Sequence, residues 1–434
     1  MTVRYITFGC KVNQYETQAM RRLMERAGYP SAPEGDTTAA VTVINSCTVT
    51  GESDRKLRQL IRKCRREAPD GIVVLTGCFP QAFPDTAGNL CADIILGNAR
   101  RAELPAAVDA YIRHLNDGGD RELRVLITPH DTVYEPLEID TFTGRTRAFV
   151  KIEDGCNRFC SYCIIPYARG RVRSRLPEDL TPELTRLAGA GYREIVLVGI
   201  NLSAYGQDTG HTLADAVERA AAVDGICRVR LGSLEPDLMS DAMLDRLAAV
   251  PTLCPQFHIA LQSGCDATLR RMNRHYTVAQ YADLCRRLRE RFPGCALTTD
   301  ILVGFPGETE EEFAETLRFA EETAFARVHV FAYSRRPGTV ADRLPDQVDE
   351  AVKADRSRRM IAVTRRTAAA YAAAYVGRTV PVLLETRRAD GLTVGHTDTY
   401  LTVCVATDRA AGELVPTVIE SAQEDILYGR EAAR

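Results

Sequence analysis

The sequence lacks any segment that would cross a membrane, because nowhere do 18 apolar residues follow one another. A secretory signal is also missing, since residues 1–5 (MTVRY) lead directly into a strand-like run. There is no low-complexity tract, and the net charge of −3 excludes a uniformly basic nucleic-acid-binding protein, although it leaves room for local basic faces. These absences predict a cytoplasmic protein of two or three globular domains for a chain of 434 residues.

Fourteen cysteines are present, and without an export signal they do not predict a disulfide framework. In a reducing compartment they are metal ligands, catalytic groups or buried core residues. Two sets of three stand out by their spacing. The seven histidines show no spacing typical of a metal site. The remaining eight cysteines are expected to be structural: Cys64, Cys91, Cys227, Cys254, Cys265, Cys285, Cys295 and Cys404.

The chain up to residue 115 alternates short β-branched runs with helical stretches, the latter at 16–27 and 52–66. This alternation predicts a doubly wound parallel α/β domain. Its strand candidates are residues 2–9, 41–46 and 71–77. Residues 116–141 have little periodicity, and we interpret them as a linker that holds at most one strand.

A longer series of alternating strands and helices fills residues 142–372 and predicts a partial (β/α)6 barrel rather than a full barrel of eight units. The six strand candidates are 147–152, 194–199, 227–233, 256–261, 296–303 and 326–333. After a helical stretch at 350–375, residues 376–434 predict a small all-β barrel. Its strand candidates are 379–386, 391–396, 400–406 and 413–420.

Cys156, Cys160 and Cys163 come directly after the first strand of the predicted barrel, on the loop where barrel enzymes place their chemistry. A structural zinc site needs four ligands, and no fourth cysteine or histidine is close by in the sequence. Three thiolates on a [4Fe–4S] cluster leave one iron open to a substrate. A zinc loop and a chance grouping are the alternatives, but the spacing and the position favour the cluster.

Cys10, Cys47 and Cys78 each follow one strand of the N-terminal domain, at separations of 37 and 31 residues that fit one βαβ repeat each. Because parallel strands point the same way, we expect the three thiols to converge at one edge of the sheet, where open α/β sheets bind their ligands. This pattern predicts a second three-thiolate cluster. Three small buried residues at strand ends are the alternative.

The Cys-x3-Cys-x2-Cys spacing, with Tyr162 before the third cysteine, resembles the radical S-adenosylmethionine (SAM) superfamily. Segments 197–201 (LVGIN), 231–236 (LGSLEP), 259–264 (IALQSG) and 304–309 (GFPGET) look like the strand ends of that superfamily that contact SAM. The resemblance implies that the open iron binds SAM and that an electron from the cluster splits it into methionine and a 5′-deoxyadenosyl radical. It implies SAM contacts from Tyr162, Gly199, Ser233, Glu235, Gln262, Asp300 and Gly304.

With the second cysteine set and the small β domain, the whole chain resembles the methylthiotransferases, which insert a CH₃S group into an unactivated C–H bond. This resemblance implies an N-terminal cluster domain, a radical SAM barrel and a C-terminal TRAM domain. It also implies two [4Fe–4S] clusters, two SAM molecules per turnover, an electron donor such as flavodoxin or ferredoxin, and a sulfur source. Residues 9–16 (GCKVNQYE) and 165–170 (IPYARG) are most similar to the branch that modifies C2 of N6-threonylcarbamoyladenosine at position 37 of tRNA.

Two groups of alternatives stay open. Sister branches of the family act on isopentenyladenosine in tRNA or on an aspartate of a ribosomal protein. A non-catalytic iron–sulfur electron carrier or sensor would instead need fully ligated clusters. Phe79 and Pro80, which follow Cys78, depart from the pattern of the branch. From their positions at strand ends, Glu235 and Arg336 are candidates for holding the target adenine, and no catalytic residue beyond the cluster ligands is predicted.

A tRNA substrate needs cationic contacts to phosphate, and three arginine-rich runs are candidates. The alternative for each run is an ordinary solvated face. Residues 378–434 contain six arginines against nine acidic residues, so the predicted TRAM domain is acidic. The three runs are Arg169, Arg171, Arg173 and Arg175; Arg55, Arg58, Arg62 and Arg66; and Lys353, Arg356, Arg358, Arg359, Arg365 and Arg366.

Overall fold

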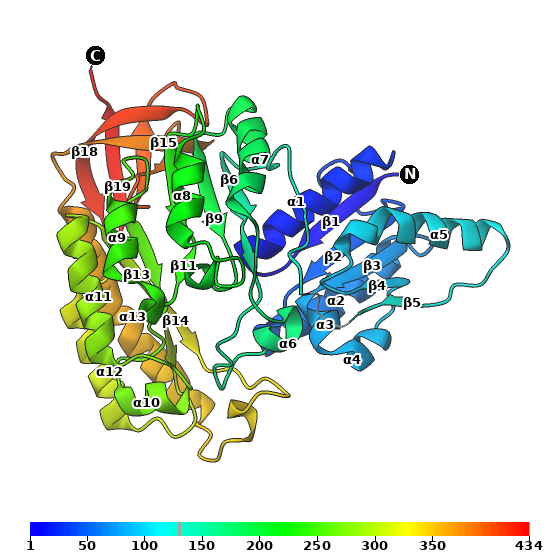
Figure 1. Cartoon of the computed structure of the whole chain (residues 1–434), viewed down its shortest axis with the longest axis horizontal. Helices are drawn as coiled ribbons and strands as arrows, with labels where there is room; N and C mark the ends of the chain where they lie inside the picture. The colour runs from blue at the N-terminus through cyan, green and yellow to red at the C-terminus, as the bar shows by residue number, and fades with distance from the viewer. Residues whose placement is uncertain (129–131, 434) are drawn as a thin grey trace. The chain divides into compact units, whose positions relative to one another are not determined.

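The computed structural model describes residues 1–128 and 132–433 and divides them into two compact units (Figure 1). The first unit consists of Met1–Thr143, Glu153–Arg175 and Ser334–Asp342. The second unit consists of Gly144–Ile152, Leu176–Tyr333 and Arg343–Arg434. Residues 129–131 of the predicted linker lie outside the described residues. No helix in the described part of the chain is both long and apolar enough to cross a bilayer.

The first unit is built on a parallel five-stranded sheet in the order β1-β2-β3-β4-β5. Its strands are β1 (Val3–Thr7), β2 (Val41–Ser46), β3 (Ile72–Gly77), β4 (Ile94–Leu96) and β5 (Arg124–Leu126). The first three correspond to the predicted strands. β4 was not predicted, whereas β5 is the one strand that the interpretation of the linker allowed for.

Both faces of this sheet are apolar, which is typical of parallel sheets covered on both sides. Val41 and Val43 of β2 face α1 (Lys11–Arg26) and α5 (Leu104–Asn116), whereas Ile44 faces α2 (Gly51–Glu67). The short helices α3 (Cys78–Ala82) and α4 (Pro84–Gly88) also cover the second face. The alternation of side chains along β2 therefore fixes three layers.

The second unit contains the six parallel strands of a partial barrel, as predicted. They are β6 (Arg147–Lys151), β9 (Glu194–Val198), β10 (Arg228–Leu231) with its continuation β11 (Ser233–Leu234), β12 (Gln256–Ile259), β13 (Ala296–Val303) and β14 (Arg327–Ala332). β9 lies between β6 and β10, and β11 begins the series β11-β12-β13-β14. No pairing among the described residues joins β6 to β14, so the barrel stays open on that side.

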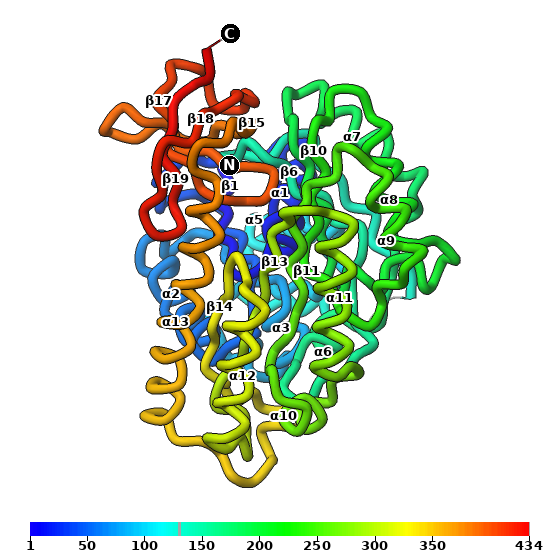
Figure 2. The backbone as a smooth tube through the Cα atoms, turned by 90° about the vertical axis from the view of Figure 1, so that its left-hand side faces the viewer, coloured from blue at the N-terminus to red at the C-terminus, as the bar shows by residue number. Residues whose placement is uncertain are grey.

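Helices alternate with these strands and cover their outer side. They are α7 (Pro177–Gly189), α8 (Leu213–Ala221), α9 (Asp241–Ala248), α10 (Asp266–Arg271), α11 (Val278–Arg291), α12 (Glu310–Thr323) and α13 (Glu350–Ala373). Sequence signals at their starts are clear: α11 and α12 begin with capping boxes at Thr277 and Thr309. Figure 2 shows the long α13 beside β14, leading to the C-terminal barrel.

The C-terminal strands form a closed barrel in the order β15-β16-β17-β19-β18, which confirms the predicted all-β domain. They are β15 (Thr379–Arg387), β16 (Thr393–His396), β17 (Thr402–Ala406), β18 (Leu414–Gln423) and β19 (Ile426–Glu431), the last of which was not predicted. Its core also takes in Ala372 and Tyr375 at the end of α13. The small barrel therefore shares a core with the helix that connects it to the larger one.

Candidate functional site

Cys10, Cys47 and Cys78 lie at the carboxyl ends of β1, β2 and β3, on one edge of the parallel sheet. Burial, with a smaller contribution from the neighbouring thiols of Cys78 and Cys10, raises the pKa of the Cys47 thiol to about 12. Cys10 is exposed, while Cys47 and Cys78 are buried.

Two glycines allow the chain to bring these cysteines together. Gly9 and Gly77 precede Cys10 and Cys78 and have φ angles of +96° and +98°, which favour glycine over residues with a side chain. A Cβ atom on Gly9 would lie 2.6 Å from the Cβ and 2.8 Å from the Sγ of Cys47. The first and second cysteines of the set are therefore close neighbours because residue 9 has no side chain.

The set of three thiols fits an iron–sulfur cluster by its chemistry. Burial raises the pKa of the Cys47 and Cys78 thiols, so cationic charge nearby is needed to favour their thiolate forms. Iron supplies that charge, and it binds the deprotonated sulfur. Phe79, the departure from the family pattern, is 1% exposed and packs in the core of the first unit.

Cys156, Cys160 and Cys163 lie on a compact loop of the first unit, between β7 (Glu153–Asp154) and α6 (Ile165–Arg169). Backbone hydrogen bonds shape it: the Cys156 amide donates to Gly170 at 2.9 Å, and the Cys163 amide donates to Cys160 at 2.9 Å. The Arg158 amide also points at the Cys156 sulfur, at 3.5 Å. A backbone donor to sulfur favours the thiolate, the form that ligates iron.

Gly155 and Phe159 give this loop its tight shape. Gly155 has a φ of +87°, and a Cβ there would overlap the carbonyl of Arg171. Phe159 has the left-handed φ of +50°, and its ring is covered by the Arg171 guanidinium at 4.7 Å. Tyr162, the aromatic residue of the motif, lies in the turn between Cys160 and Cys163. The three cysteines are thus held by a loop with little conformational freedom.

Arg169 lies at the end of α6 and connects this loop to the sheet edge. Its side chain is fully buried, and its Nε donates to the sulfur of Cys78 at 3.2 Å. Glu16 of α1 binds the same guanidinium and also pairs with the buried Arg101 at 3.1 Å. The buried guanidinium of Arg169 therefore contacts Cys78 of the first cysteine set. In the sequence, Arg169 comes six residues after Cys163, the last cysteine of the other set.

The predicted SAM-contacting residues of the second unit lie where consecutive barrel strands end. Gly199 follows β9, Ser233 lies in β11, and Glu235 follows it. Gln262 has a φ of +66°, and its backbone bridges β13 by hydrogen bonds of 2.9 Å with Asp300 and Leu302. These ends form the usual ligand-binding face of a parallel barrel.

Gly304 follows β13 and has a φ of +70°. A Cβ at this position would overlap the side chain of Lys353, so only glycine fits against α13. Its amide donates to the Glu308 carboxylate at 2.6 Å, and Arg356 binds the same oxygen at 2.8 Å. The GFPGET segment is therefore a turn held by buried charges. Asp300 is half-buried in β13.

The expectation that the histidines form no metal-ligating group is wrong. His258, Asp300 and His329, from β12, β13 and β14, bring their ligand atoms within 4.8 Å of one another. Strand register causes this, because Asp300 pairs directly with His329. The Nε2 atom of His258 lies 3.4 Å from the Asp300 carboxylate. Sequence spacing did not reveal the group, since 71 residues separate the two histidines.

The two candidates for holding adenine are engaged within the protein. Both terminal nitrogens of Arg274 bind the Glu235 carboxylate, at 3.1 and 2.6 Å. Arg336 is 3% exposed, and it pairs with Asp54 at 2.8 Å and donates to Thr48 at 2.6 Å. The prediction that Arg336 holds the target adenine is wrong, because its side chain is buried and binds residues at the start of α2.

The arginine-rich runs divide by burial. Arg169, Arg173, Arg175, Lys353 and Arg356 are buried. For these five the prediction of phosphate contacts is wrong, because their charges are satisfied inside the protein. On α2, by contrast, the arginine run lies on the side opposite the buried Leu57, Ile61 and Cys64, and its exposed members are Arg55, Arg62 and Arg66.

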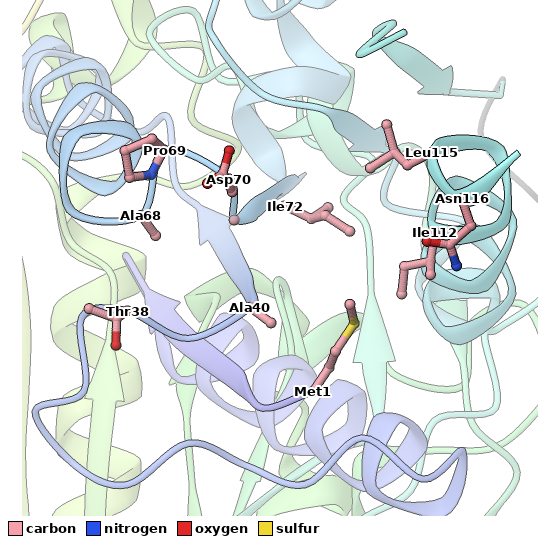
Figure 3. A pocket seen from close by; sticks show the side chains of 11 residues that line it. Met1, Thr38, Ala40, Ala68, Pro69, Asp70, Ile72, Ile112, Leu115 and Asn116 are labelled. Atoms are coloured by element: carbon pink, nitrogen blue, oxygen red, sulfur yellow. The ribbon is translucent and has the colours of Figure 1, made fainter. Parts of the chain in front are cut away.

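A cavity of about 320 Å³ lies at the opposite edge of the N-terminal sheet. Figure 3 shows Met1, Ile72, Ile112 and Leu115 around it. None of the predicted site residues lines this cavity, and its walls are mostly apolar. Its position at the amino ends of the strands separates it from the cysteine edge.

Comparison with known sequences gives two matching families. Residues 150–320 match the radical SAM superfamily, and residues 2–97 match a family described as uncharacterized protein family UPF0004. Threonylcarbamoyladenosine tRNA methylthiotransferase MtaB of Bacillus subtilis is 40% identical over 431 residues, covering 96% of this chain and 93% of that protein. The protein of the same name from Thermotoga maritima is 38% identical and covers 92% and 90%. The tRNA-2-methylthio-N(6)-dimethylallyladenosine synthase of Pelotomaculum thermopropionicum is 34% identical and covers 98% and 96%.

Solved structures show the same fold at low identity. The radical SAM methyltransferase TsrM of Kitasatospora setae, bound to cobalamin and a [4Fe–4S] cluster, has a TM-score of 0.55 and 17% identity. That match covers 79% of this chain and 77% of TsrM. The cobalamin-dependent enzyme OxsB has a TM-score of 0.52 and 11% identity, covering 83% and 55%. These similarities establish the fold alone.

Proposed function

Since the chain belongs to the radical SAM methylthiotransferase family, we propose that it places a methylthio group on C2 of N6-threonylcarbamoyladenosine at position 37 of tRNA. The observation that carries this proposal is the pair of cysteine sets within the first unit. The substrate is supported by relatives at 40% and 38% identity that are named for threonylcarbamoyladenosine, against 34% for those named for the dimethylallyl substrate.

The C2–H bond of adenine is neither acidic nor electrophilic enough for acid–base or nucleophilic chemistry at a useful rate. When bound, two [4Fe–4S] clusters and two SAM molecules per turnover supply the radical and the methylthio sulfur. In this proposal Cys156, Cys160 and Cys163 hold the cluster that binds SAM, and Cys10, Cys47 and Cys78 hold the second one.

The chain's own residues orient the ligands. In this proposal SAM is contacted by Gly199 and Gly304 at strand ends, by the polar residues Ser233, Glu235, Gln262 and Asp300, and by Tyr162. Glu235 and Asp300 are anionic groups that suit the ribose hydroxyls or the ammonium group of SAM. Arg274 holds Glu235 in one orientation by its two hydrogen bonds.

The remaining partners follow from this chemistry. Reduction of the SAM-binding cluster requires an electron donor such as flavodoxin or ferredoxin, and turnover requires a sulfur source. We place the reaction in the cytoplasm. For tRNA, the exposed arginine face of α2 suits phosphate contacts better than the acidic C-terminal barrel does.

Nucleoside mass spectrometry of tRNA from cells with and without this gene tests the proposal. We expect the 2-methylthio form of N6-threonylcarbamoyladenosine to disappear in the deletion strain and to return when the gene is restored on a plasmid. Loss of the 2-methylthio form of isopentenyladenosine instead would reassign the substrate. Retention of both forms would reject the tRNA substrate in a strain with no second methylthiotransferase gene.

A further inference from the structure

Arg169 uses every hydrogen-bond donor of its buried guanidinium. Its Nη1 donates to Glu16 at 2.8 Å and to Asp154 at 3.0 Å, and its Nη2 donates to Asn13 at 2.6 Å and to Glu16 at 2.9 Å. The fifth donor, Nε–H, points at the sulfur of Cys78 at 3.2 Å. An arginine has five N–H groups, so this side chain has none to spare.

The acceptors come from separate parts of the chain. Asn13 and Glu16 lie on α1, and Asp154 lies two residues before Cys156. Arg169 itself comes six residues after Cys163. Because all of these residues belong to the first unit, one guanidinium joins the loop of the second cysteine set to the thiol of the first.

The donors divide into two roles. The four Nη hydrogen bonds run to oxygen atoms and hold α1 and the loop together, as a buried ion pair does. The Nε hydrogen bond runs to the sulfur of Cys78, a residue that is only 2% exposed. Hydrogen bonds to cysteine sulfur, together with nearby charge, set the reduction potential of an iron–sulfur cluster.

We propose that Arg169 is a positioning residue that, through its Nε–H, holds the Cys78 sulfur and raises the reduction potential of the cluster at Cys10, Cys47 and Cys78. This inference rests on the proposed function only in assuming a cluster at this site. A cation and a hydrogen-bond donor both stabilise the more negative, reduced state of a cluster. Removing them therefore favours the oxidised state.

The test uses the full chain with both clusters reconstituted under anaerobic conditions. Potentiometric titration followed by electron paramagnetic resonance resolves two reduction steps, and the step whose spectrum does not respond to added SAM belongs to the N-terminal cluster. In Arg169→Gln we expect the equilibrium constant for reducing this cluster to fall at least tenfold, or about 59 mV for one electron. Arg169→Lys keeps the charge but not the donor geometry, and we expect a smaller shift.

Arg173→Gln is the matched control. Arg173 is also a buried arginine, and it donates to the Arg169 carbonyl at 2.9 Å and lies 3.6 Å from Asp154. No hydrogen bond from Arg173 to a sulfur is found among the described contacts. We expect its cluster potential to match the wild type. An equal shift in both variants, or no shift in Arg169→Gln with full iron content, would overturn the proposal.

If the Arg169→Gln variant cannot be studied by potentiometric titration, its iron content is measured instead. Selective loss of about four irons per chain from both Arg169 variants, with full iron in Arg173→Gln, supports the holding role of Arg169. Equal loss from all three variants rejects it in favour of a general packing role. A wild-type chain that holds only about four irons would instead show that the second cluster is absent. Neither iron result alters the outcome expected from nucleoside mass spectrometry. The proposal for Arg169 and the proposed function can therefore be rejected independently.

Discussion

The Nε atom of Arg230 in β10 donates to the carboxylate of Glu194, the first residue of β9, at 2.7 Å, and both side chains are buried. Arg228 binds the other carboxylate oxygen at 3.4 Å. Burial would raise the pKa of Glu194, but the surrounding arginines outweigh it and hold that pKa below its usual value. One carboxylate thus balances a cluster of arginines inside the second unit.

These arginines also bind the C-terminal barrel. Arg228 donates to the carbonyl of Pro381 at 2.7 Å, and Arg230 donates to the carbonyl of Asp398 at 2.7 Å. Tyr400 is covered by the Arg230 guanidinium at 4.9 Å. Through Glu194 the partial (β/α) barrel and the small β barrel therefore share one buried hydrogen-bond network.

We expect Glu194→Ala to lower the free energy of unfolding of the second unit by about 3–5 kcal/mol, because it leaves buried arginines without their counter-charge. Chemical denaturation followed by circular dichroism measures this loss. Glu218→Ala is the control, since Glu218 pairs with Arg246 at 2.7 Å on the surface and contributes about 1 kcal/mol or less. Equal losses in the two variants would contradict the role of Glu194.

The sequence predicted the elements whose pattern is local. β2 and β13 were predicted at their observed bounds, because Val41–Ser46 and Ala296–Val303 are runs of β-branched and apolar residues. β4 was missed, since Ile94–Leu96 has only three residues. β19 was missed because Ile426–Glu431 carries few apolar residues at its inward positions.

Side-chain roles that depend on distant partners could not be predicted. The alternating arginines from Arg169 onwards have the pattern of an exposed basic face, but Glu16, which neutralises Arg169, lies 153 residues earlier. The group of His258, Asp300 and His329 likewise depends on the register of three strands. Spacing along the chain predicts which cysteines share an edge, but it does not predict which charges become buried beside them.

The approach of Gly9 to Cys47 gives a second prediction. In Gly9→Ala the new methyl group would lie 2.6 Å from the Cys47 Cβ, and the φ of +96° would be strained as well. We expect the chain to lose more stability than the roughly 1–2 kcal/mol of a positive φ alone. We also expect it to lose iron from the N-terminal set, as measured by metal analysis after anaerobic reconstitution.

Gly28→Ala isolates the backbone effect, because Gly28 has a φ of +88° and no atom within 4 Å of a Cβ placed there. This control should be destabilised by the strain of positive φ but should keep its full iron content. If Gly9→Ala also kept all its iron, the close approach of residue 9 to Cys47 would not matter for the metal site.

Glu308 predicts a pH dependence of stability. Burial raises its pKa from 4.5 to about 6, although the Gly304 amide and Arg356 partly oppose the shift. Because the folded state holds this proton more tightly than the unfolded state, its contribution is fully present below pH 4.5 and is lost as the pH rises through 6. Raising this pKa from 4.5 to about 6 corresponds to roughly 2 kcal/mol.

Glu308→Gln removes this titration while keeping the size of the side chain. We therefore expect the wild type to lose up to about 2 kcal/mol of unfolding free energy relative to the variant between pH 4 and pH 7. Urea denaturation of both proteins at several pH values measures the difference. Parallel stability curves over this range would show that the Glu308 carboxyl does not titrate as its burial indicates.

Removing one cysteine from either set should abolish a different step of the reaction. In Cys160→Ala we expect no cleavage of SAM, because in the proposed function the cluster that binds SAM loses a ligand. In Cys47→Ala we expect SAM cleavage to 5′-deoxyadenosine to continue at a reduced level, with no methylthio product in tRNA. Liquid chromatography of the nucleosides and of 5′-deoxyadenosine from the same anaerobic assay measures both activities.

Cys64→Ala is the matched control for this pair. Cys64 is buried on α2 and packs in the same hydrophobic core as Leu57 and Ile61, and burial raises the pKa of its thiol. Its removal should leave iron content, SAM cleavage and methylthio transfer close to those of the wild type, apart from a loss of stability. If Cys47→Ala still formed the methylthio product at the wild-type rate, the sheet-edge cysteines would not carry the sulfur. The reaction would then have to proceed from the loop cysteines alone, which have no separate place for a sulfur donor while SAM occupies the open iron.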